Sequence, residues 1–154
     1  MRISLVAVGR LGRTPEGALA LDYAARASAA GRALGLGPVA VVEVEPRRPG
    51  KAAEAEAIRP HLTGAHVIAC DERGRPWPSR AFAERIGALR DGGVRRLALV
   101  VGGADGLDAE LLAAADERLA FGPQTWPHAL ARVMLAEQVY RAVTLLAGSP
   151  YHRD

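Results

Sequence analysis

The residues of this chain that are best placed to do chemistry lie in its last third, in two loops and a polar tail. The first loop, residues 102–106, is rich in glycine and directly follows the apolar run 97–101. The second loop, residues 121–128, precedes a long apolar segment. Glycines after a strand let a ligand approach the backbone, or they make a tight turn. The pattern alone leaves both uses open.

The tail places an aromatic ring, an imidazole and a guanidinium next to one another, at Tyr151, His152 and Arg153. These three groups could stack on a base, accept a proton and hold a developing anion, so we predict that they are catalytic. Pro150 restricts the backbone before them. The alternative is that the tail only seals the last helix against the core.

Seven cations follow three predicted strands at their carboxyl ends, where open parallel sheets bind ligands. Only Asp71 and Glu72 oppose them there. An RNA backbone could lie across this basic rim through phosphate contacts, although the same residues could equally be solvated side chains on ordinary loops. The seven are Arg10 and Arg13 after the first strand, Arg47, Arg48 and Lys51 after the second, and Arg73 and Arg75 after the third.

Familiar cofactor and metal motifs are missing from the sequence. It contains neither the G-x-G-x-x-G fingerprint of dinucleotide sites nor the G-x-x-x-x-G-K-[ST] phosphate loop. The four histidines have no metal-ligand spacing with the single cysteine, Cys70. We therefore predict no metal site, and no nicotinamide or ATP chemistry of a familiar type.

The elements that must position these residues follow from the apolar pattern, in which short strands alternate with helices. This alternation predicts a mostly parallel sheet with helices on both faces, in a single domain over residues 1–154. The predicted strands cover residues 2–8, 39–44, 66–70, 97–101 and 118–121. The predicted helices cover residues 15–31 (capped by Thr14), 52–58 (limited by Pro60), 79–92 (capped by Ser79), 107–115 and 127–144.

The last of these helices is apolar over most of its circumference, which exceeds what one small sheet normally buries. It is either central to the fold or also packed against a second subunit, and we expect a two-fold homodimer. A charge at Val139 would weaken the dimer if that residue faces the partner. Arg132 projects into the apolar face, so it is either a structural ion pair or a site residue.

Composition points to a cytoplasmic protein. The chain has 154 residues, 49% of them hydrophobic, and a net charge of only +3. A single cysteine excludes an internal disulfide and fits a reducing compartment. The first apolar run is too short for a signal peptide, and no run could span a bilayer. We therefore expect no membrane partner.

Several segments together resemble the bacterial large-subunit rRNA pseudouridine N3-methyltransferases of the SPOUT class. The order, spacing and total length of these segments carry the resemblance over essentially the whole chain. They are residues 5–9, 74–77, 99–107, 125–133, 136–142 and 150–153.

The resemblance implies a deep C-terminal trefoil knot, a homodimer and S-adenosylmethionine as cofactor, bound in the knot. Two segments depart from the family pattern: residues 120–122 are Ala-Phe-Gly in place of Ser-Leu-Ser or Ser-Phe-Ser, and Trp126 stands in place of Leu. Cys70 replaces an aliphatic residue of the family, and we expect it to form a small apolar part of the wall of the cofactor pocket. By position, the implied cofactor residues are Cys70, Gly102, Phe121, Gly122, Pro123, Gln124, Thr125 and Trp126.

The same resemblance implies a substrate, a pseudouridine in a hairpin loop of 23S rRNA that is methylated at N3 on the assembled ribosome. A compact enzyme without an added RNA-binding domain would need such a preassembled surface for its specificity. Two alternatives remain open: a methyltransferase acting on another RNA such as tRNA, and a non-catalytic ribosome-binding protein.

Overall fold

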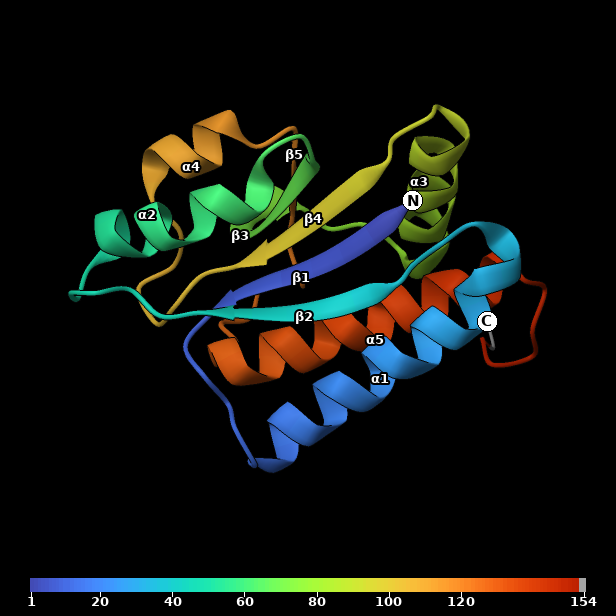
Figure 1. Ribbon diagram of the computed structural model, residues 1–154, viewed down its shortest axis with the longest axis horizontal. Helices are drawn as coiled ribbons and strands as arrows, with labels where there is room; N and C mark the ends of the chain where they lie inside the picture. Colours follow the sequence, from blue (N-terminus) through green and yellow to red (C-terminus); the bar gives the residue numbers. More distant parts are fainter. Residues whose placement is uncertain (153–154) are drawn as a thin grey trace.

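A computed structural model describes residues 1–152; Arg153 and Asp154 lie outside the described residues. Strands alternate with helices, as predicted (Figure 1). The strands are β1 (Arg2–Val8), β2 (Val39–Val44), β3 (His66–Arg75), β4 (Arg96–Val101) and β5 (Glu117–Leu119). The helices are α1 (Pro15–Gly31), the 3-10 helix η1 (Arg32–Leu34), α2 (Lys51–Leu62), α3 (Ser79–Asp91), α4 (Ala109–Ala114) and α5 (His128–Leu146).

The strands form one sheet in the order β2-β1-β4-β3-β5, and every pairing is parallel. β1 lies between β2 and β4, with Leu5 opposite Val41 on one side and Leu99 on the other. The carboxyl ends of all five strands therefore meet at one edge of the sheet. Because β4 separates β1 from β3, the segment that follows β3 is set apart from those that follow β1 and β2.

Two apolar cores cover the two faces of the sheet, because successive side chains of a strand point to opposite faces. Leu5 and Ala7 of β1 join a core with α1, α3 and α5, whereas Val6 and Val8 join a core with α2 and α4 (Figure 1). The predicted α/β class, with a parallel sheet and helices on both faces, is confirmed. The threading of the C-terminal segment through a knot stays a prediction.

Two helix ends differ from the sequence-based predictions. α2 continues to Leu62, four residues past its predicted end at Ile58, with Pro60 inside its last turn. A proline there removes only one amide donor, so the helix continues for two residues beyond it. Ser79 is the first residue of α3, and Pro78 occupies the cap position. The Ser79 hydroxyl instead donates to Gln138 Oε1 at 2.8 Å, which joins α3 to α5.

β3 extends to Arg75, beyond the predicted end at Cys70. Its pairing with β5 shifts register after Cys70, and Arg75 lies opposite Leu119. Gly74 permits this close approach, because a Cβ there would lie only 2.6 Å from the carbonyl carbon of Leu119. Residues 71–75 contain no apolar run, so the apolar pattern of the sequence does not predict this part of the strand.

α5 is central to the fold. This was one of the two explanations for its wide apolar face, the other being contact with a second subunit. Leu135, Val139 and Val143 are fully buried against α1, α3 and the sheet. Val139 therefore faces the core of its own chain, and the idea that it faces a partner subunit is wrong. Arg132 is also buried and ion-paired, which fits the structural alternative for this residue.

Candidate cofactor site and basic surface

A cavity of about 740 Å³ opens at the carboxyl ends of three strands. Cys70 of β3, Val101 of β4 and Leu119 of β5 line it. Further lining comes from the β4–α4 loop and α4, from the segment between β5 and α5, from the first turn of α5, and from Lys51 of α2. This is the edge at which open parallel sheets bind ligands, and the volume lies within the usual range for small-molecule sites, about 300–1,000 Å³.

The fold brings most of the predicted cofactor residues together at this cavity, although they come from three separate segments. Pro123 belongs to the same segment as its neighbours but does not line the cavity. What each residue binds stays a prediction. The predicted residues that line the cavity are Cys70, Gly102, Phe121, Gly122, Gln124, Thr125 and Trp126.

Gly102 is packed against the backbone of its own loop. A Cβ at this position would lie 2.8 Å from the carbonyl carbon of Gly106 and 2.9 Å from the amide nitrogen of Leu107. Gly106, with a φ of +79°, closes the turn by donating its amide to the carbonyl of Gly103 at 3.1 Å. The loop therefore requires glycine at 102 for its own closure, independently of any ligand.

Glu54 in the first turn of α2 also supports this loop, and the sequence analysis missed it. Its Oε2 accepts a hydrogen bond from the amide of Gly103 at 3.3 Å. A Cβ on Gly103 would lie 2.6 Å from Glu54 Oε1. Nothing in the spacing of Glu54 and Gly103 indicates this contact, because it depends on how α2 lies over the sheet.

Cys70 is a poor nucleophile. Its side chain is half-buried at the wall of the cavity, and burial raises the pKa of its thiol to about 12. The thiolate is the reactive form of cysteine, so at neutral pH the thiol stays protonated. This agrees with the interpretation of Cys70 as a small apolar wall.

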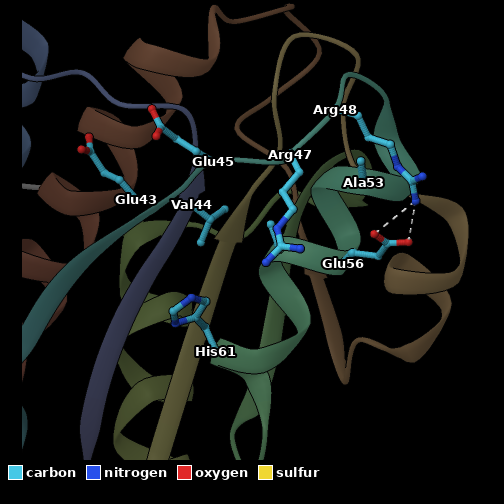
Figure 2. Close-up of a pocket in the computed structure, with 9 residues that line it drawn as sticks. Glu43, Val44, Glu45, Arg47, Arg48, Ala53, Glu56 and His61 are labelled. Carbon is cyan, nitrogen blue, oxygen red and sulfur yellow. Dashed lines mark hydrogen bonds and ion pairs between the residues drawn. The ribbon is translucent and has the colours of Figure 1, made fainter.

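The cations of the basic rim do not all line one cavity. Lys51 and Arg73 line the cavity, whereas Arg47 and Arg48 line a separate hollow between β2 and α2 (Figure 2). Arg73 and Arg75 lie within β3 instead of in a loop after it. The division falls within the segment that follows β2, between Arg48 and Lys51.

Acidic side chains also lie closer to the rim than the sequence suggests. Arg10 pairs with Glu45 at 3.4 Å and Arg48 with Glu56 at 3.2 Å. The view that only Asp71 and Glu72 oppose these cations is therefore wrong, because β2 and α2 bring further carboxylates to them. Arg13 and Arg75 are exposed.

Further polar groups at the cavity were not singled out from the sequence. Arg118 and His128 line it from β5 and from the start of α5. Asp105 and Asp108 line it from the β4–α4 loop. The Asp108 carboxylate caps α4 by accepting amide hydrogen bonds from Glu110 and Leu111, and an aspartate directly before a helix is the signal that could have identified this cap.

The described part of the tail folds back onto α5. The Tyr151 hydroxyl donates to Glu137 Oε1 at 3.0 Å, and its ring packs edge-on against Tyr140 at 4.7 Å. Nδ1 of His152 lies 3.1 Å from Nη1 of Arg141. Burial, followed by hydrogen bonds with Tyr23 and Glu137, raises the pKa of the Tyr151 phenol, so this group stays protonated. Neither Tyr151 nor His152 lines the cavity; Arg153 lies outside the described residues.

Residues 1–152 contain neither a candidate membrane span nor a candidate metal site. No helix there combines the length and the apolar character needed to cross a bilayer. No three His, Cys, Asp or Glu side chains in that range lie together in a way that could hold a metal ion.

Comparison with known proteins gave matches along nearly the whole chain. A family model described as "Predicted SPOUT methyltransferase" matches residues 1–152. Two relatives called "Ribosomal RNA large subunit methyltransferase H", from Phenylobacterium zucineum (strain HLK1) and Caulobacter sp. (strain K31), are 74% and 71% identical over 154 residues. Each match covers 100% of both proteins.

Solved structures resemble the chain in fold. A probable methyltransferase from Bordetella pertussis Tohama I superposes with a TM-score of 0.58 at 17% identity, over 92% of this chain and 96% of that one. A probable methylase family protein from Haemophilus influenzae Rd KW20 gives 0.54 at 18% identity, over 99% and 70%. At these identities the likeness concerns the fold alone.

Proposed function

Because the chain belongs to the SPOUT methyltransferase family, we propose that it methylates N3 of a pseudouridine in 23S rRNA of the assembled ribosome, with S-adenosylmethionine as methyl donor. The shared name of its relatives supports the ribosomal substrate. The observation that carries the proposal is the cavity where β3, β4 and β5 end, which is lined by the residues that the resemblance assigns to the cofactor. A cytoplasmic location follows from a ribosomal substrate.

The residues at the cavity fit this cofactor, which combines a flat base with positively charged groups. Val101, Leu107 and Leu119 offer apolar walls for the base. Asp105 and Asp108 supply carboxylates of the sign that attracts the sulfonium and ammonium groups. The cavity thus combines apolar walls with charged side chains that can fix the orientation of a small molecule.

When bound at this cavity, S-adenosylmethionine would supply a methyl group carried on a sulfonium sulfur, for transfer to N3 of the substrate base. The chain must align the substrate nitrogen with that methyl group, which is a contribution of position. His152 is the proposed acceptor of the N3 proton. Tyr151 is proposed to stack on the base, and Arg153 to stabilise the negative charge on its carbonyl oxygens.

The position of the tail favours a homodimer as the active form. Tyr151 packs against Tyr140, whereas the lining of the cavity stops at Ala131 on α5. These two α5 residues are separated by about 13 Å along the helix axis. The tail must therefore move away from α5 to serve its own cavity, or serve the cavity of a partner subunit.

An exposed apolar groove offers a place for that partner. The groove has a volume of about 610 Å³, and Leu19, Trp77 and Met134 line it. Phe121 and Gly122 line both the groove and the cavity. A second copy of the chain seated in the groove would lie beside the cavity, within reach of the substrate.

Mass mapping of 23S rRNA tests the function. A strain that lacks the gene should lose one methyl group at a pseudouridine, and the intact gene should restore it. With purified protein, ribosomes and labelled cofactor, the label should enter 23S rRNA. Transfer to free tRNA alone would instead indicate another RNA substrate, and cofactor titration without any binding would indicate a non-catalytic ribosome-binding protein.

A further inference from the structure

A second hollow, of about 480 Å³, lies between β2 and α2 and shares no lining residue with the cofactor cavity. Ala53 and Ala57 of α2 and Val44 of β2 form the apolar part of its lining. Polar side chains make up the remainder, so the hollow is suited to a charged ligand. These are Glu43, Glu45, Arg47, Arg48, Glu56 and His61 (Figure 2).

The three carboxylates of this hollow are already paired. Glu43 Oε1 lies 2.7 Å from Nη1 of Arg132. Glu45 pairs with Arg10 at 3.4 Å. Glu56 accepts from Arg48 at 3.2 Å, a contact that is visible in Figure 2. Each carboxylate thus has its own guanidinium.

Arg47 and His61 are the two remaining polar residues of the hollow, and they take no part in these ion pairs. Among residues 1–152, neither side chain has a hydrogen bond or an ion pair, and both residues are exposed. Figure 2 shows the Arg47 guanidinium directed toward the His61 ring across the hollow. Because Arg10, Arg48 and Arg132 already pair with the three carboxylates, the positive charge of Arg47 is unmatched.

We infer that Arg47 and His61 form a subsite for a phosphate of the RNA backbone, an inference that rests on the proposed function. The guanidinium presents a fork of donors that matches phosphate geometry, and an imidazole N–H can supply a further donor. The hollow also lies beside the catalytic region: Lys51 at the start of α2 lines the cofactor cavity, and His61 lies about 15 Å further along the same helix. RNA whose target base enters the cavity can therefore run along α2.

The test uses the full-length protein, ribosomes and labelled cofactor. Replacing Arg47→Ala or His61→Ala should raise the KM for ribosomes about three- to tenfold, through loss of a charge-assisted hydrogen bond. The affinity for S-adenosylmethionine should not change. With Arg47→Ala, the slope of log KM against log salt concentration should also fall by about 0.7, the value for one single-strand phosphate contact.

Arg32→Ala is the matched control. Arg32 is an exposed arginine on η1, which precedes the opposite end of β2, so its loss should change neither KM nor the salt slope. Thermal denaturation should show all three variants folded, because the replaced side chains are exposed.

The outcomes separate this inference from the proposed function. A wild-type protein that methylates no ribosomal RNA would contradict the proposed function itself. An active wild type together with an Arg47→Ala variant of unchanged KM and salt slope would overturn the phosphate subsite alone. Binding of inorganic phosphate at His61, seen by NMR, with unchanged ribosome kinetics in the variants would assign the hollow to a free anion and overturn its assignment to RNA.

Discussion

Arg132 of α5 and Glu43 of β2 form an ion pair with a 2.7 Å contact, and the Arg132 side chain is only 1% exposed. Nη2 of Arg132 also donates to the carbonyls of Val8 and Gly9, at 2.8 and 3.0 Å. The same Glu43 oxygen accepts from the amide of Leu11 at 2.9 Å. The pair therefore joins the C-terminal helix to the end of β2 and to the loop after β1.

Breaking this pair should destabilise the fold. Burial lowers the pKa of Arg132, and the neighbouring Glu43 opposes that shift. With Glu43→Gln the guanidinium stays buried without its counter-charge, which typically costs about 3–5 kcal/mol. Urea denaturation should show a loss of this size. Glu45→Gln, at the exposed pair with Arg10, is the control and should cost less than about 1 kcal/mol; equal losses in the two variants would contradict the prediction.

Gly102→Ala should abolish cofactor binding, because the added Cβ meets backbone atoms of Gly106 and Leu107 that cannot move without opening the loop. Gly103→Ala is the matched comparison, since its Cβ meets only the carboxylate end of Glu54, a flexible side chain. Titration calorimetry with S-adenosylmethionine should show a loss of at least about 100-fold for the first variant, near 3 kcal/mol, and a much smaller loss for the second. Normal binding by Gly102→Ala would place the cofactor elsewhere.

Removing the tail after Ser149 should eliminate methylation of ribosomes while cofactor binding and dimerisation are largely retained. None of the described tail residues lines the cavity, so the cofactor should lose no contact. Full activity in the truncated protein would mean that the tail has no catalytic role and only covers α5.

Mixed dimers test which subunit supplies the tail. One subunit would carry the truncation and the other Gly102→Ala, so that neither homodimer is active. If the tail serves the partner's cavity, the mixed dimer should recover up to half of the wild-type activity, because one complete site remains. An inactive mixed dimer, with an active control of one wild-type and one truncated subunit, would show that the tail serves its own chain.

Leu19→Arg should dissociate the homodimer, because Leu19 is 44% exposed and lines the apolar groove. Leu21→Arg is the control: Leu21 is 56% exposed but lies about 200° away around α1. Light scattering at micromolar concentration should give a monomer for the first variant and a dimer for the second. A wild-type protein that is a stable, active monomer would refute the dimer outright.

Cys70 should resist alkylation in the folded protein. Its thiol pKa of about 12 lies well above the ordinary value of about 8.5. Iodoacetamide at pH 8 should therefore label the native chain at least about 100-fold more slowly than the urea-unfolded chain, as measured by mass spectrometry. The thiol of Cys70 has a higher pKa in the folded chain than in the unfolded chain. Its contribution to the free energy of unfolding is therefore fully present below the pKa of the unfolded chain, and it is lost as the pH rises toward 12. Equal labelling rates would show a reactive cysteine.

The sequence by itself determined the order and type of the strands and α-helices, but not the 3-10 helix η1. Local signals fix these features: the apolar runs of β1, β2 and β4, and the Thr14 cap before Pro15. At most two residues separate predicted and observed ends of α1, α4, α5 and β5. The resemblance also indicated which loops meet at the cavity, although no periodicity places Cys70 beside Trp126.

Only the tertiary structure decided the contacts between segments that are distant in the chain. The packing of the elements places Arg47 and Arg48 at one hollow and Lys51 at another, and so divides the basic rim. It also brings Glu43 to Arg132, Glu54 to Gly103 and Gly74 to Leu119. A local pattern specifies which face of a strand or helix is apolar. What packs against that face depends on how the elements are arranged in three dimensions. Val139 is an example, because only this arrangement shows that it is buried in the core of its own chain.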